Sequence, residues 1–466
     1  MRGVPDGRTS RPARRMSLLM YQLYSALLAL ALLVSLPYWL IQWLRHGKYR
    51  ASLRQRLGKV PSRLAENRTR PVIWIHAVSV GEVLAVVGLV SKMKRAFPQH
   101  RVLISTTTAT GQELARSRFG EESVFCFPLD FGFAINPYLR RLRPELVVIA
   151  ETEFWPNFLR LAHASGARIA VVNARISDRS FPRYRRWHKI LSRVLWLVDV
   201  FLAQTEEDRR RLLAIGASPD RVQVSGNLKF DVSKPTPPPI VARLRDALQH
   251  AQAHPVVICG STVEGEEKLL LDAFGKVLDK FPRAVLMLAP RHPERFGGVA
   301  QLLEKAAIPS WCRSTWSGEP LAGGALLLDS IGELASLYAL ADLAFVGGSL
   351  VPRGGHNILE PAQHGVPILV GPYTENFRDV VRSFQVNNAV RVVEPAELPL
   401  ALVELASNEA ERKSLGRLAA ETVRAHTGAT QRTLQALGRL LDSPSQDIAL
   451  KSTLGEKEGG LATPPQ

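Results

Sequence analysis

Cysteine is scarce in this 466-residue chain, which contains only Cys126, Cys259 and Cys312. The three lie far apart and form neither a C-x-x-C pair nor a spacing with histidine that is typical of zinc sites. An odd number of cysteines without a framework excludes a small disulfide scaffold and fits a reducing compartment. The chain also lacks an acidic D-x-D motif. We therefore expect metal-independent chemistry in a cytoplasm-facing body.

Acidic residues are also few, with 42 Asp and Glu against 60 Lys and Arg, which gives a formal net charge of +18. Residues 1–70 hold fourteen Lys or Arg but only Asp6 and Glu66, a net charge of +12, so the other 396 residues carry +6. Because the excess flanks one hydrophobic segment, it favours an anionic lipid surface over nucleic acid as the partner.

That segment runs from Met16 to Leu44 without a charged residue. It is long enough to span a bilayer, and we expect Pro37 to kink or divide it. Tyrosine and tryptophan near both ends suit the membrane interface. A cleaved signal peptide is the alternative, but no small-x-small cleavage site precedes the basic run 45–56. Basic residues flank both ends, so charge alone does not fix an orientation.

After this segment, short Val- and Ile-rich runs alternate with helical patterns, which predicts parallel sheets covered on both faces. Four prolines within 235–239 interrupt the alternation and indicate an interdomain linker. The expected strands are 72–76, 101–106, 146–150, 168–172 and 200–204 before the linker, then 256–259, 284–288, 325–328 and 343–346.

The predicted fold is therefore α/β, with two Rossmann-like domains behind a membrane-anchoring helix. Residues 1–50 form the extension and anchor, 51–234 the first domain and 235–440 the second. Residues 441–466 lack an apolar period, and we expect them to be a disordered tail.

Ligands of such sheets bind beyond the carboxyl ends of the strands. Glu82 follows the first strand in the segment HAVSVGE and starts a helix. A carboxylate there is stabilised by the helix dipole, and it could also take a proton from a hydroxyl group. Glu151 and Glu153 follow another strand and, by the alternation of side chains, should point apart rather than share one site. Lys229, near the linker, could stabilise negative charge or remain solvated.

The second half carries two glycine pairs, 347–348 and 354–355, which lead into Asn357 and Glu360. Glycine allows a close approach of backbone to ligand, and a helix start offers N–H groups to a phosphate. Asn357 and Glu360 also have the spacing of a capping pair. Arg291 follows another expected strand and suits a phosphate or a carboxylate. The pattern predicts a nucleotide or nucleotide-sugar site.

Six segments in chain order resemble the 3-deoxy-D-manno-octulosonic acid (Kdo) transferases, from the anchor to about residue 430. They are HAVSVGE at 76–82, ETEFWPN at 151–157, NARISDRS at 173–180, GNLKFD at 226–231, APRHPERF at 289–296 and FVGGSLVPRGGHNILEPAQHG at 345–365. The resemblance implies an inverting, metal-independent GT-B glycosyltransferase without a cofactor, at the cytoplasmic face of the inner membrane. It also implies transfer of Kdo from CMP-Kdo to the lipid A precursor (lipid IVA) in lipopolysaccharide synthesis.

Carried over residue by residue, the resemblance makes Glu82 the proton acceptor and makes Glu151 and Lys229 stabilisers of the transition state. The positions that it implies for CMP binding are Pro290, Arg291, Ile331, Gly332, Glu333, Asn357, Ile358, Leu359 and Glu360. The chain departs from the family pattern at Val263, where a histidine is common.

The basic and aromatic stretch 175–193 is expected to contact the membrane or the acceptor, although a solvated helix face would look the same. Three other functions are compatible with parts of the sequence. A GT-B transferase that uses UDP-N-acetylglucosamine shares the glycine loop, and a sugar-nucleotide epimerase shares the double Rossmann body. A basic membrane scaffold would account for residues 1–70 alone.

Overall fold

The computed structural model describes residues 18–46, 50–65, 69–231, 236–306 and 308–442, with the side chains of 37–51 and 65 left out. Contacts divide the chain into two units, Met1–Asp231 with Gly428–Gln466, and Val232–Thr427. The centre of the predicted linker and the predicted tail from residue 443 onward lie outside the described residues.

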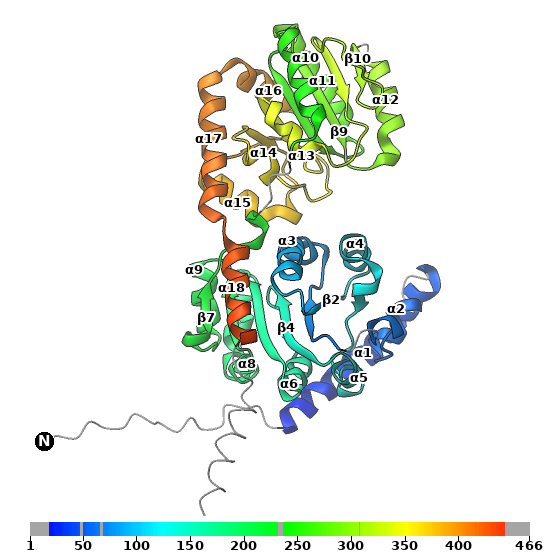
Figure 1. Cartoon of the computed structure of the whole chain (residues 1–466), viewed down its shortest axis with the longest axis vertical. Coiled ribbons are helices and arrows are strands. Elements are labelled where there is room, and N and C mark those ends of the chain that lie inside the picture. Colours follow the sequence, from blue (N-terminus) through cyan, green and yellow to red (C-terminus); the bar gives the residue numbers. More distant parts are fainter. Residues whose placement is uncertain (1–17, 47–49, 66–68, 232–235, 307, 443–466) are drawn as a thin grey trace, which may run out of the picture. The chain divides into compact units, whose positions relative to one another are not determined.

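The first unit is built on a seven-stranded sheet with the order β3-β2-β1-β4-β5-β6-β7, in which neighbouring strands are parallel (Figure 1). Its strands are β1 (Val72–His76), β2 (Arg101–Thr106), β3 (Val124–Cys126), β4 (Pro144–Ala150), β5 (Arg168–Ala174), β6 (Val200–Ala203) and β7 (Val222–Val224). The five strands expected in this half are confirmed. The short edge strands β3 and β7 were not predicted.

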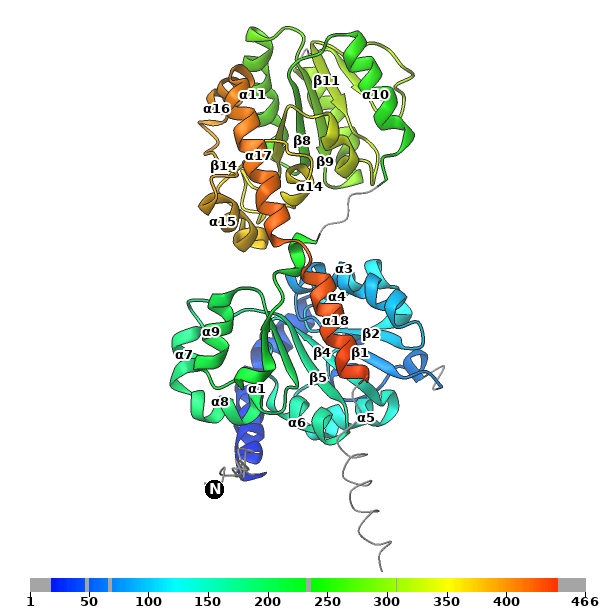
Figure 2. The same ribbon diagram turned by 60° about the vertical axis from the view of Figure 1, so that its left-hand side comes forward.

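Side chains that alternate along β1 enter two different cores. Trp74 packs in one core with residues of α5, α6, α8 and α9, while Ile73 and Ile75 pack in the other with residues of α3, α4 and α18. Figure 2 shows α18 crossing the sheet. These helices are α3 (Val80–Ala96), α4 (Ala109–Phe119), α5 (Gly132–Leu142), α6 (Pro156–Ala164), α7 (Phe181–Arg186), α8 (His188–Leu195), α9 (Glu206–Ala214) and α18 (Ala429–Asp442).

The N-terminal part is the apolar helix α1 (Leu18–His46), followed by α2 (Arg50–Arg56). The stretch Leu18–Leu36 is long and apolar enough to cross a membrane. One side of α1 joins the first unit, because Tyr21 is buried in its core, while Leu23, Leu27 and Leu30 are exposed. The helix continues through Pro37, so the predicted division of the segment is not observed.

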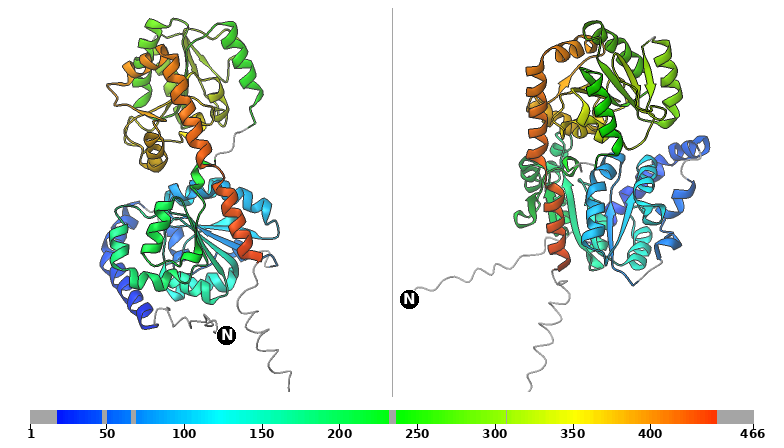
Figure 3. Two further views of the ribbon diagram at one scale, coloured as in Figure 1. Left: turned by 90° about the vertical axis from the view of Figure 1, so that its left-hand side faces the viewer. Right: turned by 45° about the horizontal axis from the view of Figure 1, so that its top comes forward.

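The second unit contains another seven-stranded parallel sheet, with the order β10-β11-β9-β8-β12-β13-β14 (Figure 3). The strands are β8 (Val256–Thr262), β9 (Val285–Pro290), β10 (Ser310–Cys312), β11 (Gly324–Leu327), β12 (Leu343–Val346), β13 (Ile368–Val370) and β14 (Arg391–Val392). Two separate Rossmann-like units are the elements of the GT-B architecture, and this prediction is confirmed.

Helices cover both faces of the second sheet as well. Residues of α11, α12 and α16 fill one core, and residues of α10 with Leu337 and Tyr338 fill the other. The helices of this unit are α10 (Pro239–His250), α11 (Glu266–Lys280), α12 (Phe296–Lys305), α13 (Leu334–Leu337), α14 (Leu359–Ala362), α15 (Arg378–Val386), α16 (Leu398–Ser407) and α17 (Glu409–His426).

The second domain was predicted to extend to residue 440, but the second unit ends at Thr427. Gly428, with φ of +91°, separates α17 from α18. The Asp231 carboxylate accepts hydrogen bonds from the N–H groups of Gly428 (2.6 Å) and Thr430, and this fastens α18 to the first unit. Leu434 and Leu437 then complete the core beside α3. The sequence pattern shows the apolar face of α18, but it does not show which of the two sheets that face covers.

Candidate active site

Glu82 lies in the first turn of α3, and its side chain is buried. The Val78 N–H donates to Glu82 Oε2 at 2.7 Å, and the Ser79 hydroxyl donates to Oε1 at 2.9 Å. Burial raises the pKa of Glu82 to about 8, against the lowering effect of these hydrogen bonds. A carboxyl group with this pKa is suited to accept a proton near neutral pH.

Glu151 and Glu153 act on the same carboxyl group, because the charge of each raises the pKa of Glu82. The prediction that their side chains point apart assumed an extended segment, which the backbone does not form at Glu151. Glu151 has φ of +58°, and its N–H donates to the Val172 carbonyl oxygen at 2.9 Å. A residue in the left-handed region interrupts the extended chain, so the alternation of side chains does not apply here. Three carboxyl groups thus act on one another electrostatically at the strand ends of the first unit.

Lys229 reaches the start of α3 from η4 (Leu228–Phe230). Its Nζ lies 4.0 Å from the position that a Cβ on Gly81 would take. Two asparagines hold the short helix: Asn173 Oδ1 accepts from the Leu228 N–H at 2.9 Å, and Asn227 Oδ1 accepts from the Lys229 N–H at 3.0 Å. Within the described part of the chain the Lys229 ammonium group has no ion pair, so its charge is available to a substrate.

His76 opens the HAVSVGE segment, and no role was predicted for it. Its ring is fully buried, stacks on Phe127 with 3.8 Å between ring centroids, and lies 3.0 Å from the Ser105 hydroxyl through Nδ1. Burial lowers the pKa of His76 to about 3, so the ring is neutral.

In the second unit, Glu266 organises the glycine loop after β12. Its buried carboxylate accepts from the N–H groups of Val263 (3.0 Å), Gly348 (2.7 Å), Ser349 (2.9 Å) and Leu350 (2.8 Å). Glu266 was not singled out from the sequence, because its role as an acceptor depends on two segments that are distant in sequence. Burial raises the pKa of Glu266 against these four hydrogen bonds.

Asn357 and Glu360 contact each other, but not as the predicted capping pair, because Ile358 is the N-cap of α14 and Glu360 accepts from the Asn357 side chain. Asn357 Oδ1 accepts from the Leu359 N–H at 3.1 Å, and its amide donates to Glu360 Oε1 at 3.2 Å. Arg291, which is exposed just after β9, lowers the pKa of both Glu360 and His356 by its charge. For each of these two groups burial has the larger effect, and it raises the pKa of Glu360 and lowers that of His356 to about 4. The structure thus brings Arg291 to the predicted loop.

The other residues predicted for CMP binding differ in what they can offer. Ile331 is 79% exposed, and Gly332 has φ of +89°. Glu333 is held by Arg313 at 2.8 Å and by the Ser330 hydroxyl at 2.6 Å. The side chains of Pro290, Ile358 and Leu359 are buried, so a ligand would meet their backbone.

Comparisons with known proteins decide the family. The family model described as 3-deoxy-D-manno-octulosonic-acid transferase (kdotransferase) matches residues 51–232. The 3-deoxy-D-manno-octulosonic acid transferase of Haemophilus influenzae is 35% identical over 376 residues, covering 79% of this chain and 87% of that protein. The chain belongs to the Kdo transferase family. The Bordetella pertussis transferase is 36% identical over 415 residues, covering 86% of this chain and 95% of its own.

Solved structures were also compared. The C-terminal CMP-Kdo binding domain of WaaA from Acinetobacter baumannii is 32% identical, with a TM-score of 0.37, over 39% of this chain and 98% of that one. The calicheamicin glycosyltransferase CalG4 is 14% identical, with a TM-score of 0.47, over 80% of this chain and 100% of its own.

The basic stretch 175–193 presents both aromatic and cationic side chains to solvent. Phe181 and Tyr184 pack against the core, whereas Trp187 is 56% exposed beside the exposed side chains of Arg186 and Lys189. An exposed tryptophan among cations is typical of a surface that meets lipid headgroups.

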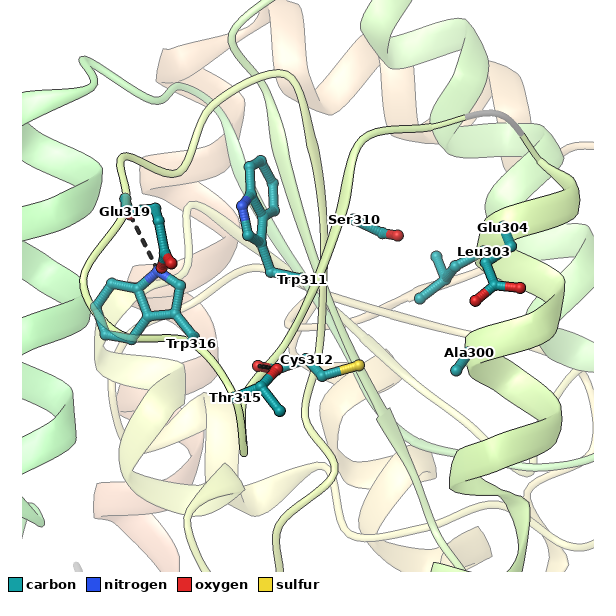
Figure 4. A pocket seen from close by; sticks show the side chains of 9 residues that line it. All are labelled: Ala300, Leu303, Glu304, Ser310, Trp311, Cys312, Thr315, Trp316 and Glu319. Atoms are coloured by element: carbon teal, nitrogen blue, oxygen red, sulfur yellow. Dashed lines mark hydrogen bonds between the residues drawn. The ribbon is translucent and has the colours of Figure 1, made fainter.

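A cavity of about 290 Å³ in the second unit lies elsewhere (Figure 4). It is lined by residues of α12, β10 and the following loop, and the Trp316 indole donates to the Glu319 carbonyl oxygen at 3.0 Å beside it. It contains none of the residues predicted for CMP binding. Among the described residues, no group of three or more His, Cys, Asp and Glu could hold a metal ion.

Proposed function

We propose that this Kdo transferase moves Kdo from CMP-Kdo to a hydroxyl group of the lipid A precursor, with Glu82 as the general base. The observation that carries the proposal is the buried Glu82 carboxyl group, whose pKa is raised to about 8. An ordinary exposed glutamate is too weak a base for a sugar hydroxyl, and matching the pKa to the working pH makes proton transfer efficient.

In the reaction, ionised Glu82 takes the proton of the acceptor hydroxyl as its oxygen attacks the anomeric carbon of Kdo. The bond from that carbon to the CMP phosphate oxygen breaks, and CMP leaves with the electron pair. Attack opposite to the leaving group inverts the anomeric centre. Lys229, which reaches the start of α3, supplies positive charge for the negative charge that develops. Glu151 helps to keep the pKa of Glu82 high.

CMP-Kdo is assigned to the strand ends of the second unit. Arg291 is exposed beside the loop that carries His356, Asn357 and Glu360, and it suits a phosphate or the Kdo carboxylate. The loop N–H groups of Gly348, Ser349 and Leu350 are already bound by Glu266, so this carboxylate shapes the loop rather than the ligand.

The membrane anchor is assigned to α1, and the body to the cytoplasmic face of the inner membrane. The exposed apolar side of α1 supports this assignment, as do three cysteines that are all free. A lipid-linked acceptor gives an enzyme a reason to remain at the membrane.

The test is incubation of the full-length protein with CMP-Kdo and the lipid A precursor, followed by mass spectrometry of the lipid. We expect the mass increase of added Kdo from the native protein. E82Q should lower the rate by about 10²–10⁴-fold, the typical contribution of a general base, with CMP affinity unchanged. E113Q is the matched control, because Glu113 is an exposed glutamate of α4 in the same unit. Near-normal turnover by E82Q would refute the assignment, and tighter competition by UDP than by CMP would indicate a different donor.

A further inference from the structure

Five arginines lie near the amino-terminal ends of the central strands of the first sheet. Glu82 lies beyond the opposite, carboxyl-terminal ends. Val72, which begins β1, pairs with Arg101 of β2 and with Pro144 of β4. Arg70 therefore lies just before β1, and Arg143 directly precedes Pro144, the first residue of β4. The last turn of α5 adds Arg140 and Arg141. The five residues of β1 separate the two ends of the strand by roughly 17 Å, so this cluster is not part of the catalytic site.

The arginines line a cavity of about 190 Å³. Its other lining residues are Leu64, Pro71, Val72 and Leu142, so none of the described residues that line it is acidic. The nearest acid in sequence, Glu145, is engaged elsewhere, because it pairs with His100 at 3.0 Å. Sites for whole drug-sized ligands measure about 300–1,000 Å³, so this cavity suits a smaller group.

Two of the arginines are fixed, and three are available. Arg70 donates to the carbonyl oxygens of Pro98 and Gln99, and Arg101 donates to that of Leu64 at 3.2 Å. Arg140, Arg141 and Arg143 are exposed and have neither an ion pair nor a side-chain hydrogen bond to the part of the chain that the structure describes. The cavity is thus lined both by guanidinium groups that are held by hydrogen bonds and by guanidinium groups that have no partner among the described residues.

The helix dipole explains only part of the cluster. Cations in the last turn of a helix are stabilised by its carboxyl end, which accounts for Arg140 and Arg141. It does not account for Arg143, which caps α5 in the left-handed region with φ of +47°. Glycine or asparagine is favoured at such a position, and an arginine there costs free energy. Neither the helix dipole nor the backbone conformation therefore explains an arginine at position 143.

We propose that this cavity binds a phosphate group, which is the anion that clustered guanidinium groups match best. Arg141 and Arg143 are the main donors, and Arg70 and Arg101 form the preorganised wall. The group is a phosphate monoester or free phosphate in solution, or the phosphate of a lipid headgroup. The residues of this site belong to the first unit, and those predicted for CMP belong to the second.

The test uses the full-length protein in a neutral detergent, with CMP at saturation so that the nucleotide site is filled. Sodium phosphate is titrated at constant ionic strength, and the rise in unfolding temperature is measured. A second arm replaces free phosphate with short-chain phosphatidic acid in the micelles and uses short-chain phosphatidylcholine as the neutral comparison. The variants are R141Q and R143G, and the matched control is R118Q. Arg118 is also the penultimate residue of an 11-residue helix and is exposed.

We expect R141Q to weaken phosphate binding about tenfold, while R118Q matches the native protein. R143G should weaken binding equally, yet unfold without phosphate at an equal or higher temperature, because glycine removes the strained backbone. A response to phosphatidic acid alone assigns the site to lipid, and a response to free phosphate assigns it to a soluble monoester. The proposal is overturned if neither ligand stabilises the native protein, or if R141Q and R143G respond like R118Q.

Discussion

The charge of Glu151 raises the pKa of Glu82, although the two residues belong to different strand ends of the first sheet. Burial is the larger cause, and Glu153 adds to the effect. The raised pKa of Glu82 therefore comes mainly from burial, with a smaller contribution from the charge of Glu151, whose backbone is left-handed.

Replacement of Glu151 by glutamine should move the pH dependence of transfer. Removal of its charge lowers the pKa of Glu82, so the acid limb of the kcat/KM profile shifts to lower pH by a fraction of a unit. E153Q should shift it in the same direction, since Glu153 also raises this pKa. E113Q, an exposed control, should leave the profile unmoved. A profile identical in all four proteins would contradict the electrostatic role.

The ionised Glu82 side chain should lower the free energy of unfolding at alkaline pH. Its pKa in the folded protein is about 8, above the ordinary value of 4.5, so the folded state binds this proton more tightly than the unfolded state. The stabilisation is complete below about pH 4.5 and is lost as pH rises towards 8.

Accordingly, E82Q should unfold with the same free energy as the native protein near pH 5 and with about 2–4 kcal/mol more near pH 9. Urea unfolding at the two pH values measures the difference. If the difference in free energy of unfolding between the native protein and E82Q is the same at both pH values, the pKa of Glu82 is not raised.

Glu266 should be essential to the glycine loop of the second unit. E266A leaves four N–H groups, those of Val263 and of Gly348 to Leu350, without their acceptor. We expect a loss of about 3–5 kcal/mol in the free energy of unfolding, and weaker CMP binding. Thermal unfolding with and without CMP measures both effects. E264A is the control, because the Glu264 side chain is 79% exposed; equal behaviour of the two variants would refute the role.

The apolar helix α1 should be held to the catalytic unit by a polar contact. The Asn157 amide donates to the Ser25 hydroxyl at 2.9 Å and to the Asp130 carbonyl oxygen at 2.7 Å. Asp130 in turn accepts from the N–H groups of Asn157 and Phe158, where α6 begins. The contact thus joins α1 to the helix that follows Glu151 and Glu153.

N157A should therefore lower the free energy of unfolding by about 1–3 kcal/mol, and S25A by about 1 kcal/mol. The matched control is S117A, because Ser117 donates to a carbonyl oxygen of its own helix at 2.8 Å, as Ser25 does. Urea unfolding in detergent compares the three variants. If S25A and S117A have the same effect, the contact does not hold the helix.

Much of the fold could be predicted because buried parallel strands are short apolar runs. The runs 72–76, 101–106 and 343–346 coincide with β1, β2 and β12. The three-residue strands β3, β10 and β13 were missed because so short a run carries no period. The strand expected at 256–259 extends to Thr262 as β8, through a bulge at Ser261, which has φ of +58°.

The sequence by itself determined the two Rossmann-like units, the apolar N-terminal helix and the family, because each depends on local patterns or on segments in chain order. It also placed Asn357 beside Glu360, since three residues separate them, although their hydrogen bond joins two side chains and is not the predicted cap. Only the tertiary structure decided that Glu151 and Glu153 act on Glu82, that Glu266 binds the glycine loop, and that α18 returns to the first sheet. These relationships join segments distant in the chain, and burial, which sets the pKa of Glu82, exists only once the chain has folded.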